Sequence, residues 1–255
     1  MKNRVFLVLA SAAVALMLAS TATGASPSVL SPSSPHYGKT YGQWSQQWWQ
    51  WALSIPVHAP PDSTRVIHPL VDLTGAKCGV GQSGPVWFLG GVFFAFGTSG
   101  NTTFTRSDCV VPSDRAIFLP LLNTECTAVE GPGNFCGATE AESRSIVAGQ
   151  ASSMTDLRAS IDGSPITITS AYRVGSPQKP SFCVSLPQDD LLSFAGEGPG
   201  GYGSGTHFSP GSSCSTVDDG YYVMLAPLSP GRHVLNTHAR IDTFVLDVTY
   251  DLTVR

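Results

Sequence analysis

The chain has 255 residues, of which 42% are hydrophobic but only 13% are charged, with 26 glycines and 19 prolines. So little charge and so many turn-forming residues favour short strands joined by turns and exclude a helical bundle. The formal net charge is −4 and no basic run occurs. We therefore expect no nucleic-acid partner, because nothing would neutralise the phosphates.

The first 25 residues have the pattern of a secretory signal peptide. Lys2 and Arg4 precede an apolar run over residues 5–17, and small residues as far as Ala25 offer cleavage sites. The run is shorter than the roughly 20 residues that cross a bilayer, and no later segment is apolar enough to do so. The sequence therefore predicts a secreted or periplasmic protein with no membrane span in the mature chain.

Residues 26–39 are rich in proline and serine and lack hydrophobic periodicity, so we expect an extended or disordered leader. Residues 40–255 are expected to form a single domain. Its first element is a helix that begins at Thr40, because Thr40 and Gln43 have the spacing of a capping box. Pro56 ends this helix.

Four of the five tryptophans fall in this predicted helix. Trp44, Trp48 and Trp51 form one stripe, which predicts that they pack on a sheet. Trp49 lies about 140° around the helix from Trp44. We therefore expect Trp49 to be half exposed and propose it as a contact for a ligand, such as a carbohydrate, or for a partner. A membrane-interface helix is disfavoured because the polar face carries glutamine rather than lysine and arginine.

The middle of the chain alternates between strand and helix patterns. Residues 86–94 and 102–106 flank a glycine-containing turn and predict a hairpin, and residues 116–119 predict a buried strand. A second capping box, Thr139 with Glu142, predicts a helix over residues 139–154. Asp162-Gly163 then predicts a tight turn between two strands.

The last third predicts three strands, at residues 221–225, 233–236 and 244–254. In the last strand the alternating apolar residues from Phe244 to Val254 share one face. The fold class that follows is mainly β, a sandwich of immunoglobulin-like or jelly-roll-like type, with an N-terminal tryptophan-rich helix and one further helix.

Six cysteines follow the signal peptide, so an oxidising compartment makes three disulfides the expected state. Turn-forming residues 130–133 and the glycine-rich segment 196–211 each lie between two neighbouring cysteines, which favours local pairing; the two remaining cysteines form the third pair. We predict Cys78 with Cys109, Cys126 with Cys136, and Cys183 with Cys214. No histidine lies near a cysteine at ligand spacing, so neither a metal nor a cofactor is expected.

Four blocks, at residues 37–56, 72–91, 109–126 and from residue 219 onward, carry a resemblance to known sequences. The motifs GKTYGQWSxxWWQWA and GQSGPVWFL within them are similar to those of a family of uncharacterised secreted bacterial proteins. The resemblance covers most of the mature chain. It implies an exported single-domain bacterial protein and assigns no catalytic residue.

Catalytic motifs are nearly absent. Residues 196–201 match G-x-G-x-x-G, but no strand and helix flank them, so we expect a flexible loop rather than a dinucleotide site. His68, Asp72 and Glu125 lie near predicted strand ends and could serve a hydrolase if the fold brought them together. The alternative is that Asp72 caps a turn and that the other two have no catalytic role.

Three functions follow from these observations. The first is an exported non-catalytic binding or cell-envelope protein with an unknown extracellular ligand, for which carbohydrate is one candidate. The second is a secreted hydrolase that acts on glycans or another extracellular polymer through carboxylates. The third is a purely structural envelope protein.

Overall fold

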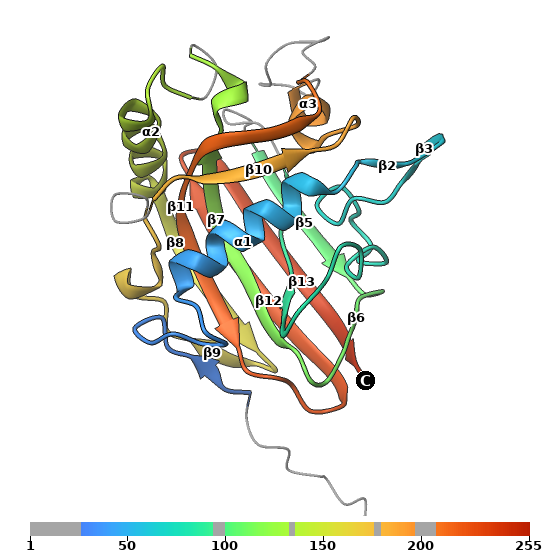
Figure 1. The fold of residues 1–255 in the computed structure, drawn as a ribbon. Coiled ribbons are helices and arrows are strands. Elements are labelled where there is room, and N and C mark those ends of the chain that lie inside the picture. The colour runs from blue at the N-terminus through green and yellow to red at the C-terminus, as the bar shows by residue number, and fades with distance from the viewer. Residues whose placement is uncertain (1–26, 94–99, 133–135, 176–179, 197–207) are drawn as a thin grey trace, which may run out of the picture.

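The computed structural model describes residues 27–93, 100–132, 136–175, 180–196 and 208–255. The predicted signal peptide and most of the G-x-G-x-x-G segment lie outside these residues. The described chain is mainly β and forms a sandwich-like fold of two sheets, with α1 lying across the outer side of one of them (Figure 1).

The larger elements and their bounds are as follows. The five-stranded sheet contains β1 (Val29–Leu30), β11 (Gly211–Leu225), β7 (Ala116–Cys126), β4 (Val86–Phe88) and β10 (Phe182–Leu186). The six-stranded sheet contains β5 (Gly100–Arg106), β13 (Phe244–Val254), β12 (Gly231–Ile241), β8 (Met154–Ile161), β9 (Ser164–Ile166) and β6 (Val110–Val111). Outside the sheets lie α1 (Tyr41–Ser54), α2 (Glu140–Ser152), α3 (Leu191–Gly196), a ribbon of β2 (His58–Ala59) and β3 (Asp62–Val66), and the 3₁₀ turns η1 (Ala128–Glu130) and η2 (Ser170–Tyr172).

Two layers of apolar side chains hold the fold together. The first lies between the two sheets and joins residues such as Leu119 and Val223 to Leu235 and Leu252. The second lies between α1 and the other face of the five-stranded sheet. The predicted inward face of the last strand is confirmed, since its six alternating residues are all buried: Phe244, Leu246, Val248, Tyr250, Leu252 and Val254.

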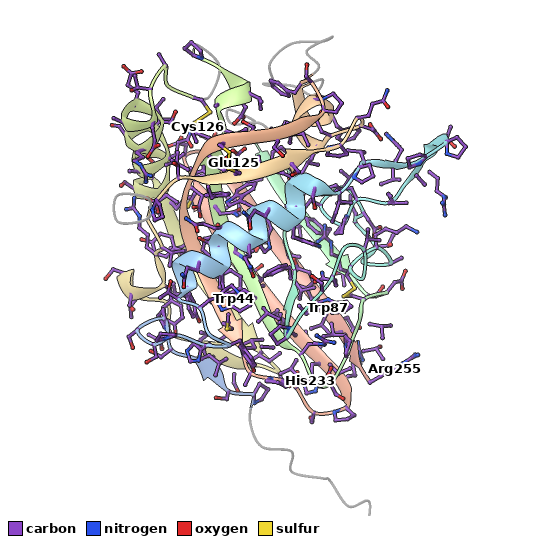
Figure 2. The ribbon with its side chains drawn as sticks, in the orientation of Figure 1. Trp44, Trp87, Glu125, Cys126, His233 and Arg255 are labelled. Atoms are coloured by element: carbon purple, nitrogen blue, oxygen red, sulfur yellow. A yellow bond between two sulfur atoms is a disulfide. The ribbon has the colours of Figure 1, made fainter. Side chains whose placement is uncertain are left out.

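The helix α1 begins as predicted. The Thr40 hydroxyl accepts a hydrogen bond from the Gln43 amide at 3.3 Å, and the Gln43 side chain accepts one from the Thr40 amide at 2.9 Å. The predicted stripe of Trp44, Trp48 and Trp51 is buried on the sheet, and Trp44 is labelled in Figure 2. Each indole N–H of this stripe donates to a backbone carbonyl, the shortest being that of Trp48 to Leu89 at 2.7 Å.

Several local predictions agree with the structure. The second capping box starts α2, and Asp162 and Gly163 have φ of 50° and 77° in the turn that joins β8 to β9. All three predicted disulfides are present: Cys78–Cys109, Cys126–Cys136 and Cys183–Cys214. The strand predicted at residues 116–119 continues as β7 to Cys126, and α3 is a further short helix that the sequence analysis did not predict.

The predicted hairpin of residues 86–94 with 102–106 is wrong. Its two strands belong to different sheets, because β4 pairs in parallel with β7 whereas β5 pairs in parallel with β13. Alternation of apolar residues defines which face of a strand is buried. It does not define the neighbouring strand.

The predicted half-exposure of Trp49 is also wrong, since only 3% of this residue is exposed. A second surface covers the side of α1 that faces away from the stripe. The Trp49 ring packs edge-on against Trp48, with centroids 4.9 Å apart, and against Phe93 at 6.3 Å. The segments that carry Leu70 and Phe93, joined by a hydrogen bond from the Phe93 amide to the Leu70 carbonyl, therefore bury a position that the helical wheel places off the packed face.

This packing predicts the effect of shortening the two neighbouring tryptophans. Trp48→Ala and Trp49→Ala should each lower the free energy of unfolding by about 3–5 kcal/mol, because each removes a buried indole. Trp48→Phe should cost more than Trp49→Phe, because only the Trp48 indole N–H has a hydrogen-bond acceptor and its loss leaves the buried Leu89 carbonyl unpaired. Urea denaturation of the four variants measures this order. A larger loss for Trp49→Phe than for Trp48→Phe would contradict it.

Candidate functional site

The site begins where β4 ends. β4 pairs only with Ala116–Phe118 of β7, so residues 120–125 of β7 have no strand beside them on that edge among the described strands. After Leu89 the chain passes through Gly90 and Gly91 between α1 and β13. A Cβ on Gly90 would lie 2.8 Å from the Trp48 ring, and one on Gly91 would lie 2.9 Å from Leu246. A larger residue at either position would force these neighbouring side chains to move.

The crossing is fixed by buried polar side chains from the six-stranded sheet. The Arg106 guanidinium donates to the carbonyl groups of Gly90 and Gly91, and the Tyr250 hydroxyl donates to the Gly90 carbonyl. Arg106 is itself 3% exposed and lies over the rings of Phe104 and Tyr250. Side chains of the six-stranded sheet therefore hold the backbone at Gly90 and Gly91 in place.

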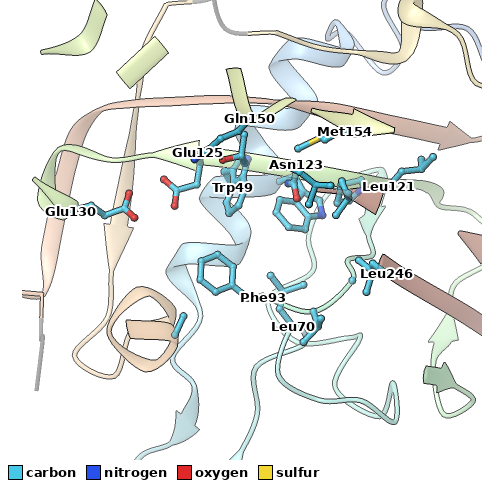
Figure 3. Close-up of a pocket in the computed structure, with 18 residues that line it drawn as sticks. Trp49, Leu70, Phe93, Leu121, Asn123, Glu125, Glu130, Gln150, Met154 and Leu246 are labelled. Atoms are coloured by element: carbon cyan, nitrogen blue, oxygen red, sulfur yellow. Dashed lines mark hydrogen bonds between the residues drawn. The ribbon is translucent and has the colours of Figure 1, made fainter. Parts of the chain in front are cut away.

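A cavity of about 90 Å³ lies beside this uncovered edge of β7, between α1 and the sheets (Figure 3). Its apolar wall includes Trp48, Trp49, Leu70, Phe93, Leu121, Met154 and Leu246. Its polar end contains Asn123, Thr124, Glu125, Glu130 and Gln150. Because Asn123, Gln150 and Phe93 are only half-buried, the cavity approaches the surface at these residues.

Two carboxyl groups dominate the polar end. Glu125 comes from β7 and Glu130 from η1, and Figure 3 shows their carboxyl groups turned toward each other beside the Trp49 ring. Glu125 is 8% exposed and Glu130 3%. Asp218, buried on β11, is paired in register with Glu125. Figure 2 places Glu125 and Cys126 at the opposite end of the sandwich from His233 and Arg255.

Burial and neighbouring acids raise the pKa of Glu125 well above its ordinary value of 4.5. Loss of hydration is the largest cause, followed by the charge of Glu130, a hydrogen bond to Glu130 and the charge of Asp218. The Oε2 atom of Glu125 is buried and has no hydrogen-bond partner. A hydrogen bond between two carboxyl groups requires one shared proton, so the Glu125–Glu130 pair holds one proton, and Oε2 of Glu125 can still accept a hydrogen bond.

The short loop after β7 positions Glu130. The Cys126–Cys136 disulfide closes this loop, and Glu130 Oε2 accepts a hydrogen bond from the Thr127 amide at 2.7 Å. The Thr127 hydroxyl in turn accepts one from the Thr216 hydroxyl on β11 at 3.0 Å. Sequence analysis missed Glu130, although Thr127 and Glu130 have the capping-box spacing that identified α1 and α2.

The Trp49 indole N–H is the other buried polar group of the cavity wall without a hydrogen bond. It lies near the hydroxyl of Tyr222 but outside hydrogen-bond geometry; burial raises the pKa of Tyr222 well above its ordinary value, and the nearby Trp49 opposes this shift. The Tyr222 hydroxyl already accepts a hydrogen bond from the Asn123 amide at 3.0 Å. We therefore assign Trp49 the role of an aromatic wall rather than of a donor.

His68 is completely buried and holds two backbone segments together. Its Nδ1 accepts a hydrogen bond from the Leu70 amide at 3.0 Å, so Nε2 carries the proton and donates to the Ala52 carbonyl at 2.9 Å. Burial lowers the pKa of His68 to about 4, so the ring is neutral at pH 7. These bonds attach the segment before the cavity wall to the end of α1.

Asp72 caps a turn, as the structural alternative predicts. Its carboxylate accepts hydrogen bonds from the amides of Thr74 at 3.0 Å and Lys77 at 2.8 Å. Partial burial raises the pKa of Asp72, but the hydrogen bonds outweigh this effect and hold the pKa below its ordinary value. No hydrogen bond or ion pair of the described residues joins His68, Asp72 and Glu125. Of the three, only Glu125 lines the cavity.

Comparison with known proteins adds little. Neither family models nor curated proteins give a match to the chain. One solved structure, described as PbICP-C in complex with falcipain-2, is similar over 66% of this chain and 98% of its own chain, with 8% sequence identity and a TM-score of 0.23. A likeness this weak carries no argument. Within the described residues, no helix has the length and apolar character to cross a membrane, and no group of three His, Cys, Asp or Glu side chains has a metal-binding arrangement.

The raised pKa of Glu125 predicts how stability depends on pH. Folding favours the protonated carboxyl, so this contribution is fully present below about pH 4.5 and is lost as pH rises through the raised pKa of the folded state. Glu125→Gln keeps a neutral group of similar shape. The variant should therefore lose less stability than the wild type as the pH rises above about 4.5.

Urea denaturation at several pH values provides the measurement. Asp114→Asn is the matched control, because the Asp114 side chain is 75% exposed and the substitution removes the same charge from the surface. The control should follow the wild-type curve. A Glu125→Gln curve parallel to that of the wild type would show that Glu125 is not the group responsible.

Proposed function

We propose that this is an exported binding protein that takes a small ligand, or one end of a larger ligand, into the cavity beside β7. The observation that carries the proposal is a cavity with apolar walls whose polar end holds Glu125 Oε2, buried and without a hydrogen-bond partner. Ligand sites typically combine apolar walls with a few convergent polar groups. A buried acceptor without a donor lowers stability, and a ligand N–H or O–H would remove that cost.

The size of the cavity limits what can enter. An apolar protein cavity of roughly 150 Å³ holds a benzene molecule, whereas one water needs only about 10–15 Å³. A volume of about 90 Å³ therefore accommodates several water molecules or a compact group of about four to six heavy atoms. A whole oligosaccharide is too large for it.

The disulfides and the burial of Trp49 both affect this proposal. The three disulfides fit an oxidising compartment, which supports export as the predicted signal peptide does. The suggestion of a carbohydrate depended on an exposed Trp49 ring as a platform. Because that ring is buried, the sugar hypothesis loses its specific support.

The paired carboxyl groups favour a hydrolase as the second candidate. Two carboxyl groups that share one proton can act as a general acid and base toward a bound water, as in aspartic proteases. Glu125 and Glu130 would carry those roles here, while His68 and Asp72 would not, because backbone groups occupy them. Glu130→Gln would abolish hydrolysis of a substrate that enters the cavity, whereas a binding protein would show no turnover at all.

Thermal unfolding in the presence of a set of small amines, alcohols, amides and carboxylic acids tests the binding proposal. A compound that binds only the folded state raises the apparent stability, by about 1.4 kcal/mol at roughly ten times its Kd. Val92 lines the cavity and is half-buried, so Val92→Trp should fill the entrance and remove this effect. Val92→Ala is the matched control and should retain it. The proposal fails if no compound stabilises the wild type, or if Val92→Trp responds as the wild type does.

A further inference from the structure

The charge of the cavity lining is of one sign. Among the lining residues that the structure describes, the ionisable side chains are Glu125 and Glu130, and there is no lysine, arginine or histidine. Asp218 adds a third buried carboxyl group behind Glu125. An anionic group would be repelled by this arrangement, while a cationic group would be attracted to it.

The hydrogen-bonding capacity at the polar end is also asymmetric. Glu130 Oε2 accepts from the Thr127 amide, and Gln150 Oε1 accepts from the Thr124 hydroxyl. Glu125 Oε2 is buried and has no donor. The group that completes this end of the cavity must therefore supply an N–H or O–H donor.

The opposite wall is aromatic. The Trp49 ring contacts both Trp48 and Phe93 edge to face, with interplanar angles of 90° for Trp48 with Trp49 and 84° for Trp49 with Phe93. These rings therefore present π-faces in different directions around one region. Aromatic faces stabilise organic cations more strongly than neutral groups, most of all where water is excluded.

We propose that the cavity binds an organic ammonium group, which donates an N–H to Glu125 Oε2 while its short hydrocarbon chain packs against Trp49 and Phe93. The ligand class is thus a small alkylammonium ion or the amine end of a larger molecule. This inference rests on the proposed binding function. A neutral alcohol would satisfy the same donor requirement but would gain neither the charge attraction nor the contact with the aromatic faces.

The test uses three probes of nearly equal size: n-butylammonium chloride, n-butanol and sodium butyrate. Their affinities are measured by titration calorimetry at about pH 7, with potassium chloride balancing the ionic strength. We expect n-butylammonium to bind about tenfold more tightly than n-butanol, and butyrate not to bind. Glu130→Gln, which removes the one negative charge of the carboxyl pair, should remove the preference for the ammonium ion and retain the binding of n-butanol. Asp114→Asn, which removes an exposed charge, should behave as the wild type.

Two results would overturn the inference. One is equal affinity of the wild type for n-butylammonium and n-butanol, and the other is an ammonium preference that survives in Glu130→Gln. In either case the cavity still binds a small molecule, so the proposed function stands and only the ligand class is wrong. If none of the three probes binds and the wider compound set also gives no stabilisation, the proposed function fails as well. Should Glu130→Gln not fold, the wild type carries the test through the relative affinities of n-butylammonium, n-butanol and butyrate.

Discussion

The close approach of α1 to the chain at Gly90 and Gly91 is the constraint on which the site depends. Because neither residue has a Cβ, Trp48 on one side and Leu246 on the other can nearly touch the same backbone. The chain thereby leaves β7 and crosses between the layers, where Arg106 and Tyr250 bind its carbonyl groups. A strand that continued alongside β7 would have paired with residues 120–125 and filled the cavity. The absence of side chains at Gly90 and Gly91 thus allows the cavity beside residues 120–125 of β7 to stay open.

Local elements were predictable because their determinants lie within a few residues. Capping boxes, the Asp162-Gly163 turn and the alternation in β13 depend on short-range geometry, and each disulfide joins two cysteines that are consecutive in the sequence. Sheet membership was not predictable in this way. β4 and β5 are near neighbours in sequence, yet each finds its partner strand far along the chain. The prediction that Trp49 is half exposed failed for the same reason, since the residues that cover it are remote from α1 in sequence.

The candidate site was predictable only in part. Glu125 was one of three acidic or histidine candidates, and nothing local distinguished it from His68 and Asp72. What separates them is hydrogen bonding: backbone amides and carbonyls saturate His68 and Asp72, whereas one oxygen of Glu125 is left without a donor. Glu130 had a visible signal in its spacing from Thr127. Its burial against Glu125, however, requires both the closed loop and the neighbouring strand β11.

The desolvation that makes Glu125 costly also makes it selective. In water a carboxylate discriminates weakly between an ammonium ion and an alcohol, because the solvent screens the charge. In the cavity the negative charge of the Glu125–Glu130 pair acts through a low-dielectric surrounding, so the energy difference between a cationic and a neutral partner increases. The fold can tolerate an unpaired buried oxygen because the Cys126–Cys136 disulfide and the Thr127 hydrogen bonds hold the loop independently of it. Stability is therefore supplied next to the carboxyl pair, which leaves Glu125 itself available for a ligand.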